Sequence, residues 1–377
     1  MTINAISGGT RPIRVGIIGA GNWAHYGHLR VLTLLPEFEI TAIQSRRREV
    51  AEAAATRFNI PHVLETVEQM AGHPDVDLVV VLTPAPQHEA GVSAALAAGK
   101  DVYAEWPLST STALSKSFID LAEKSGKRHL VGLQRRLSAT NRYLRDQIAN
   151  GYIGNLRSVR MHVSMNYFQA KLPKSLAWTA PPENFSSMMA IYAGHFLDAL
   201  FSIVGQPASL SALTLNQFSE ITIIETGEKI QTTNPDEVVV IGQLVNGGVF
   251  TVHLEGGKRN GSGVQIDITG DEGDLTITNS SAFGDVGEDY VIKGAHGNRL
   301  PLDVLRVPGN YNWLPPSELP SAVLELANLY VAYARDISAG TRIAPTFEDA
   351  VRMHTIIDLI EHSSNTGNRV DVPKAPA

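Results

Sequence analysis

Apolar and polar residues alternate along residues 13–133 in a pattern that predicts a parallel α/β sheet. Five short apolar runs, each bounded by polar residues, have the length of buried strands. The stretches between them, such as residues 89–98 and 113–124, have the length and apolar spacing of helices. Strands that alternate with helices imply right-handed crossovers and a sheet covered on both faces. The predicted strands are residues 13–18, 38–43, 76–82, 102–104 and 129–133.

The pattern changes after Ser138, where longer β-rich segments follow a predicted helix at residues 140–150. The turn Asn246-Gly247-Gly248 is typical of a hairpin. Two helical stretches, residues 321–338 and 346–363, come last, so this part is α+β with a large, mainly antiparallel sheet. We expect one domain over residues 1–137 and a second over residues 138–377. The predicted strands of the second are residues 156–165, 237–245, 248–255 and 264–269.

Composition narrows the classes of function. The 377 residues are 44% hydrophobic and 18% charged, as in soluble globular proteins, and the net charge of -7 argues against nucleic acid as a partner. The chain has no cysteine, which excludes disulfides and zinc–thiolate sites. No apolar run approaches the ~20 residues that span a bilayer, and residues 1–11 lack the apolar core of a signal peptide. We expect a cytoplasmic protein with no membrane partner.

A glycine-rich loop, GIIGAGNWA over residues 16–24, follows the first predicted strand and opens a helix. Gly19 permits the tight turn and Gly21 lets a pyrophosphate approach the backbone, while Ala24 is small enough for helix–strand packing. Asn22 and Trp23 start the helix, whose N-terminus favours an anion. Trp23 either packs or touches phosphate through its backbone. The position of the loop predicts a Rossmann fold that binds a dinucleotide.

The second predicted strand ends in Gln44, without the acidic residue that NAD-specific sites place there to bind the ribose 2′-hydroxyl. Ser45 and Arg46 follow instead, and a hydroxyl and a guanidinium can bind a 2′-phosphate. We therefore expect NADP, with NAD as the alternative. Arg47 and Arg48 are also consistent with a solvated helix start.

Several motifs together resemble the Gfo/Idh/MocA family, the glucose–fructose oxidoreductases and inositol dehydrogenases. The likeness extends over nearly the whole chain and implies a Rossmann domain followed by an α+β domain. The motifs are GIIGAGNWA at 16–24, TPAPQH at 83–88, AAGKDVYAEWP at 97–107, GLQRR at 132–136, GYIG at 151–154, GH at 194–195, GDEGDL at 270–275 and FEDA at 347–350.

The resemblance implies where the cofactor binds. Thr83, Pro84 and His88 would line the nicotinamide half of its site, at the carboxyl end of a strand. Glu105 and Gln134 would lie beside the nicotinamide. This assignment extends the dinucleotide site from the glycine loop to three further segments of the first domain.

The substrate side also follows from the resemblance. His195 would face the substrate as acid/base catalyst. The alternative interpretation is that His195 is buried in a helix, with the hydrogen-bonding atoms of its ring satisfied by the protein. Trp178 lies in the loop that caps the nicotinamide in relatives, and Trp106 and Tyr192 complete the expected substrate-binding residues with Asp198. Asp198 is one turn after His195, so it orients that histidine or serves the structure alone.

The other histidines give no clear function. His25 and His28 either pack beneath the first helix or contact the cofactor. Acidic residues and histidines lack the spacing of metal ligands along the sequence, so we expect no metal site.

Two departures from the family pattern leave the function open. The lysine that does the proton chemistry in the family's Glu-Lys-Pro motif is Trp106 here. The aspartate four residues before the family histidine is Ile191. The branch of the fungal galactose-pathway repressor shares this pattern, with a bound dinucleotide and a role as a transcriptional switch.

We weigh two functions from different classes. The first is an NAD(P)-dependent oxidoreductase that transfers hydride to or from a sugar, polyol or related carbonyl compound. The second is a dinucleotide-binding sensor read by a protein partner. Both bind a small, carbohydrate-like molecule, and the open sheet of the second domain favours a homo-oligomer, a dimer or a tetramer.

Overall fold

The computed structural model describes residues 11–282 and 290–374, which form two compact units. The first unit contains the chain up to Gln134, with Trp313–Ser317 and Val323–Val351. The second contains Arg135–Asn312, with Glu318–Ala322 and the chain from Arg352. The division lies close to the boundary expected at residue 137, but the C-terminal segment contributes to both units. Residues 1–10 and the last three of the tail lie outside the described residues.

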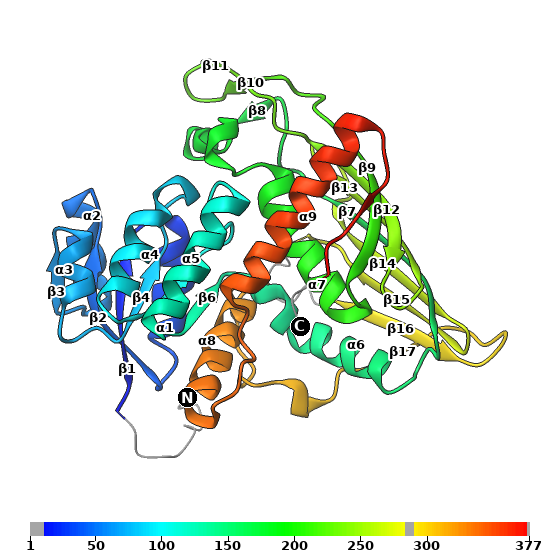
Figure 1. Cartoon of the computed structure of the whole chain (residues 1–377), viewed down its shortest axis with the longest axis horizontal. Helices are drawn as coiled ribbons and strands as arrows, with labels where there is room; N and C mark the ends of the chain where they lie inside the picture. The colour runs from blue at the N-terminus through cyan, green and yellow to red at the C-terminus, as the bar shows by residue number, and fades with distance from the viewer. Residues whose placement is uncertain (1–10, 283–289, 375–377) are drawn as a thin grey trace. The chain divides into compact units, whose positions relative to one another are not determined.

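The first unit is built on a six-stranded parallel sheet of order β3-β2-β1-β4-β5-β6 (Figure 1). The order changes direction between β1 and β4, and in open α/β sheets a ligand binds at the carboxyl ends of the strands at such a point. Only β3 was missing from the sequence prediction, because its three half-buried residues give no apolar run. The strands are β1 Ile13–Ile18, β2 Phe38–Gln44, β3 His62–Leu64, β4 Leu78–Val81, β5 Asp101–Ala104 and β6 His129–Val131.

Helices connect these strands and pack on the sheet. Helix α5 is capped by Ser111, whose side chain accepts a bond from the backbone N–H of Leu114. Helix α8 packs Tyr330 against the rings of Phe38 and Tyr103, with centroids 5.3 and 5.8 Å away. The helices are α1 Leu29–Leu32, α2 Arg48–Phe58, α3 Val67–Gly72, α4 His88–Ala97, α5 Thr112–Ser125 and α8 Ser321–Ala339.

The second unit contains a nine-stranded sheet of order β17-β16-β15-β14-β7-β13-β12-β9-β18. It is mainly antiparallel, as expected, but β7 and β13 pair in parallel. The predicted hairpin turn at residues 246–248 joins β12 to β13. The strands are β7 Leu156–Ser164, β9 Pro207–Leu215, β12 Glu237–Leu244, β13 Val249–Glu255, β14 Gly263–Gly270, β15 Gly273–Asn279, β16 Val291–His296, β17 Asp303–Val304 and β18 Val370–Asp371.

One face of this sheet is buried. Met161 of β7 and Phe250 of β13 lie in the core, and Phe201 of helix α7 (Gly194–Val204) packs on Phe250 with ring centroids 5.4 Å apart. The helical stretch Pro182–Val204 is long and apolar enough to span a membrane by composition alone, which we did not expect from the sequence. However, 78% of its apolar window is buried, as in the core helix of a folded domain.

The remaining elements of the second unit are small or lie at its edges. Ser363 and Ser364 of α9 accept bonds from the backbone N–H groups of Ala212 and Thr214 in β9. The elements are helices α6 Ala139–Ala149 and α9 Phe347–Thr366, and a small sheet of β8 Lys171–Leu172, β10 Glu220–Ile223 and β11 Lys229–Gln231.

Candidate functional site

The glycine loop leaves β1 in a conformation that only glycine adopts easily. Gly19 has φ +100°, and a Cβ on it would lie 3.0 Å from the backbone carbon of Leu82. Gly21 is exposed, and a Cβ there would meet no described atom within 4 Å. The helix begins at Asn22 and includes a π-helical turn, Ala24–His28. The backbone at Gly21 is therefore open to a ligand.

The carboxylate of Glu105 lies directly after β5 and is held by other side chains of the first unit. Its Oε1 accepts hydrogen bonds from Trp23 Nε1 at 2.9 Å, His28 Nε2 at 2.6 Å and the Tyr103 hydroxyl at 2.8 Å. Burial raises the pKa of Glu105, but the bonds from His28, Trp23 and Tyr103 outweigh that effect and lower it below its ordinary value. Glu105 is therefore ionised at neutral pH.

His28 links this carboxylate to helix α8. The ring is fully buried, and its Nδ1 lies 2.7 Å from the hydroxyl of Tyr330. An ionised carboxylate only accepts, so Nε2 of His28 carries the proton and Nδ1 accepts from Tyr330. Burial raises the pKa of the Tyr330 hydroxyl, which keeps it protonated as a donor. His28 is thus a buried core histidine with both ring nitrogens bonded.

Trp106 and Gly132 border the same carboxylate. The Trp106 side chain is buried, and the residue precedes a cis peptide bond to Pro107. A Cβ on Gly132 would lie 2.4 Å from Glu105 Oε2 and 2.9 Å from the Tyr103 hydroxyl. Glycine after β6 is therefore what lets Glu105 occupy its position, a requirement that the sequence analysis did not identify.

The residues expected around the nicotinamide follow β4 and β6. Within the described residues, the buried Oγ1 of Thr83 and the buried Oε1 of Gln134 have no hydrogen-bond partner. His88 is buried, with ring nitrogens 2.6 Å from the Thr83 carbonyl oxygen and 3.0 Å from that of Leu108. Burial lowers the pKa of His88, so the neutral ring donates to one carbonyl and supports the Thr83–Pro84 turn. Thr83 and Gln134 offer polar atoms that a bound group could satisfy.

The three arginines after β2 differ in their contacts. Arg48 forms ion pairs with Glu52 at 2.8 Å and Glu65 at 2.7 Å. The exposed Arg46 makes no hydrogen bond or ion pair with the residues that the structure describes. The Oγ of Ser45 accepts a hydrogen bond from the backbone N–H of Arg47. Arg46 is therefore available for a ligand, whereas Arg48 is committed to the helix face.

These residues fit a pyridine dinucleotide at the carboxyl edge of the first sheet. The glycine loop follows β1, Thr83 follows β4, Glu105 follows β5 and Gln134 follows β6, and parallel pairing places all four ends on one edge. The structure thus brings together positions that the family resemblance assigned to the cofactor. The sequence predictions missed Tyr103 and Tyr330, whose hydroxyls in buried, apolar segments signalled a need for polar partners.

Apart from Trp106 of the first unit, the residues expected on the substrate side lie in the second unit. Tyr192 lies in a π-helical turn, Met188–Ala193, which leads directly into α7 and His195. Tyr167 stacks on Tyr192 with centroids 6.1 Å apart, and burial raises the pKa of the Tyr192 hydroxyl. Trp178 is 43% exposed in a short 3-10 helix, Lys174–Thr179. Tyr192 and His195 thus share one continuous helical stretch.

Asp198 is not oriented toward solvent. The residue is 3% exposed, and its carboxylate accepts a bidentate pair of bonds from Arg136, with Nε 2.8 Å from Oδ2 and Nη2 also bonded to Oδ1. This geometry favours a structural role for Asp198 over contact with substrate. His25, the other histidine left open, has its pKa lowered mainly by burial and packs against the ring of Phe58.

Known proteins resemble both units. Residues 13–133 match the family model described as "Oxidoreductase family, NAD-binding Rossmann fold", and residues 142–279 match that described as "Gal80p, C-terminal domain". The galactose/lactose metabolism regulatory protein GAL80 of Saccharomyces cerevisiae is 25% identical across 96% of this chain and 94% of its own. Dehydrogenase aclE of Aspergillus oryzae is 29% identical across 62% of this chain and 68% of its own.

Solved structures agree on the fold. Levoglucosan dehydrogenase in complex with NADH and L-sorbose superposes with a TM-score of 0.85 at 21% identity, over 97% of this chain and 100% of its own. A super-repressor mutant of Gal80p from Saccharomyces cerevisiae also superposes with a TM-score of 0.85, at 22% identity over 96% of this chain and 98% of its own. Residues 13–133 thus match the Gfo/Idh/MocA oxidoreductase family, and residues 142–279 match the C-terminal domain of Gal80p.

Proposed function

We propose that the protein is an NAD(P)-dependent oxidoreductase that acts on a sugar, polyol or related carbonyl compound. The observation that carries the proposal is the cofactor edge of the first unit. Gly21 is open there, and the unsatisfied oxygen atoms of Thr83 and Gln134 lie after β4 and β6, on either side of β5. A bound nicotinamide would supply the hydride acceptor or donor. The dehydrogenases among the relatives support this class of reaction.

The proton must be handled by a group other than lysine. Trp106 does not exchange protons near neutral pH, because its indole N–H is only a donor. Glu105 is ionised and its Oε1 already accepts three bonds, so we assign it to positioning Trp23 and His28. We propose His195 as the acid/base group, on the family resemblance and because its ordinary pKa lies near neutrality.

A single-turnover experiment tests this function. The chain is mixed with NADPH or NADH and a panel of ketoses, aldoses and inosose-type ketones, and nicotinamide absorbance is followed, with the reverse reaction run on polyols. We expect His195→Ala to slow turnover by about 10²–10⁴-fold with nucleotide affinity unchanged. His362→Ala, an exposed histidine on α9, is the matched control. Unaltered turnover in His195→Ala would remove this histidine from the mechanism.

A second function has its own support. Trp106 replaces the catalytic lysine, and the regulatory protein GAL80 aligns with 96% of this chain. We propose as the alternative a non-catalytic sensor, in which the dinucleotide is bound without turnover and a protein partner responds to the bound state. Absence of turnover with every compound in the panel, together with a ligand-dependent change in nucleotide affinity, would favour the sensor.

We propose a preference for NADP(H) over NAD(H). The support is the combination of Ser45, the uncommitted Arg46 and the absence of an acidic residue at the end of β2. Equilibrium titration with NADPH and NADH, followed by nicotinamide fluorescence, measures the preference directly. Tighter binding of NADH would contradict it.

We also propose that the chain forms a homo-oligomer through the outer face of the nine-stranded sheet. Large apolar side chains are exposed there on neighbouring strands, namely Leu213, Leu215, Ile241 and Val249. Exposed apolar patches of this kind are typical of protein interfaces. Light scattering after size-exclusion chromatography tests this, with Ile241→Lys expected to yield monomer.

A further inference from the structure

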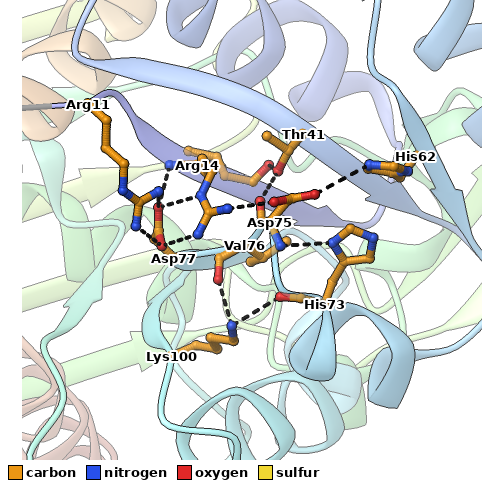
Figure 2. A network of polar contacts seen from close by, with 10 residues as sticks. Arg11, Arg14, Thr41, His62, His73, Asp75, Val76, Asp77 and Lys100 are labelled. Atoms are coloured by element: carbon orange, nitrogen blue, oxygen red, sulfur yellow. Dashed lines mark hydrogen bonds and ion pairs between the residues drawn. The ribbon is translucent and has the colours of Figure 1, made fainter.

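Two histidines and an aspartate converge at the amino-terminal edge of the first sheet, the edge opposite the glycine loop. His62 begins β3, and His73 and Asp75 lie in the loop between α3 and β4 (Figure 2). One ligand atom from each lies within 4.8 Å of the others, which no other group of three such residues achieves within the described residues. We propose that this cluster binds Zn²⁺ or a similar divalent transition-metal ion.

The loop that carries two of the three ligands is fixed by side chains from other elements. Thr41 Oγ1 donates to the carbonyl oxygen of Asp75 at 2.5 Å. Lys100 Nζ donates to the carbonyl oxygens of His73 at 3.1 Å and Val76 at 2.7 Å (Figure 2). These bonds hold the backbone before an ion arrives, so binding orders little additional structure.

The Asp75 carboxylate is oriented so that one oxygen faces a histidine. Arg14 Nη1 donates to Oδ1 at 2.6 Å, and Oδ2 lies 3.8 Å from His62 Nε2. Arg14 divides its guanidinium between Asp75 and Asp77, and Arg11 pairs with Asp77 as well. An outer partner that fixes one carboxylate oxygen and leaves the other toward the ion is common around metal sites.

His73 presents a nitrogen in the form that a metal requires. The backbone N–H of Asp75 donates to its Nδ1 at 3.2 Å, so this nitrogen is unprotonated and carries a lone pair. An ion bound there would replace the amide as its partner. The rings of His62 and His73 have centroids 4.5 Å apart, so the two imidazoles are close neighbours.

The donor set selects the class of metal. Imidazole nitrogen suits Zn²⁺ and its neighbours in the transition series, whereas Mg²⁺ and Ca²⁺ prefer oxygen. Zn²⁺ with ligand bonds of about 2.0–2.2 Å places tetrahedral ligand atoms about 3.3–3.6 Å apart. The His62–Asp75 pair, at 3.8 Å, must therefore close by about 0.2–0.5 Å. The His62 and Asp75 side chains are 41% and 49% exposed, which admits the ion and lets water complete its coordination.

Such an ion would join β3 to the loop before β4. His62 and Asp75 are brought together by the fold, so the ion binds the folded chain in preference to the unfolded chain and raises its stability. The site is independent of the proposed reaction, because its three ligands lie at the other edge of the sheet from Glu105 and Gly21.

Isothermal titration of the metal-free chain without an affinity tag tests the proposal. We expect one Zn²⁺ per chain, a rise in the melting temperature with ZnCl₂, and no response to MgCl₂. His62→Ala and His73→Ala should each weaken Zn²⁺ binding at least about tenfold, the minimum seen for loss of a supporting partner. Asp75→Asn, which keeps an acceptor for Arg14, should weaken it similarly. His362→Ala is the matched control and should bind as the parent does.

A Co²⁺ absorption spectrum gives a second readout that does not depend on stability. Binding at this site should give visible bands in the parent chain and in His362→Ala, and these bands should be lost in His62→Ala and His73→Ala. Circular dichroism confirms that each variant is folded. The proposal is overturned if the parent takes up no Zn²⁺, or if either histidine variant binds it with the stoichiometry and affinity of the parent.

Discussion

The two edges of the first sheet hold histidines and carboxylates in opposite arrangements. At the carboxyl edge, the side chain of Glu105 is 15% exposed, and one of its oxygens accepts bonds from three side chains. One of these is His28, whose other ring nitrogen is bonded to Tyr330, so both of its nitrogens are occupied. At the amino edge, Asp75 is half-exposed and one of its oxygens faces His62 at 3.8 Å, beyond hydrogen-bond range. The same residue types therefore serve as a closed internal network at one edge and as open ligands at the other.

The difference shows how burial decides what a histidine–carboxylate pair does. A buried pair must satisfy its polar atoms within the protein, and this fixes the tautomer and orientation of each ring. A half-exposed pair on a fixed backbone keeps lone pairs free for an ion. The predictions below compare the two edges, beginning with the largest expected effect.

The largest effect is expected at the glycine loop. Gly21→Val should abolish dinucleotide binding while the chain stays folded, because the branched side chain enters space that is open in the structure. Gly72→Val is the matched control at the amino edge, where a Cβ also meets no described atom. Titration with NADPH and NADH measures the nucleotide affinity of both variants. Binding retained by Gly21→Val would place the nucleotide elsewhere.

The buried network should matter more for stability than the exposed cluster. His28→Ala leaves Glu105 and Tyr330 without their shared partner, and we expect a loss of about 3 kcal/mol in the free energy of unfolding. The same change at His62, which is 41% exposed, should cost less than about 1 kcal/mol in EDTA. Urea unfolding compares the two, and equal losses would show that burial does not separate them.

The nucleotide preference offers a comparison between neighbouring arginines. Arg46→Ala should weaken NADPH binding by ~1.5–3 kcal/mol, the size of one charge-assisted contact, and leave NADH binding unchanged. Arg48→Ala should alter neither, because Arg48 is paired with Glu52 and Glu65. Fluorescence titration measures each affinity. An equal loss for both nucleotides in Arg46→Ala would show that this arginine does not contact the 2′-phosphate.

The carboxyl edge was predictable because its residues belong to motifs that follow strands. Gly19, Thr83 and Glu105 each come directly after an apolar run, and parallel pairing brings such positions to one edge. The network behind them was not predictable, because Tyr330 is 225 positions from Glu105 along the chain and only helix packing brings the two together.

The amino edge was hidden from the sequence for a related reason. His62 starts a strand too short to give an apolar run, and its distance to His73 along the chain matches no metal-binding motif. The fixed loop depends on Lys100 and Thr41 from other elements. The same limit explains why α8 was expected in the second domain, since local spacing predicts a helix but not its packing partner.

The smallest effect concerns acid sensitivity, for which Asp77 at the amino edge and Glu105 at the carboxyl edge are expected to behave alike. Burial raises the pKa of Asp77, but bonds from Arg14 and Arg11 outweigh it and hold the pKa well below its ordinary range. The network around Glu105 lowers the pKa of that carboxyl as well. A carboxyl with a depressed pKa in the folded state contributes stability above its unfolded pKa of about 4 and loses it as the pH falls toward its folded pKa. We therefore expect the free energy of unfolding to fall between pH 5 and pH 2, each limit being about one to two units from that value.

The free energy of unfolding of Asp77→Asn and Glu105→Gln should fall less steeply with pH than that of the parent. Glu49→Gln, an exposed control on α2, should follow the parent. Urea unfolding across this range gives the slopes, and a slope in Asp77→Asn parallel to the parent would show that its ion pairs do not persist in solution.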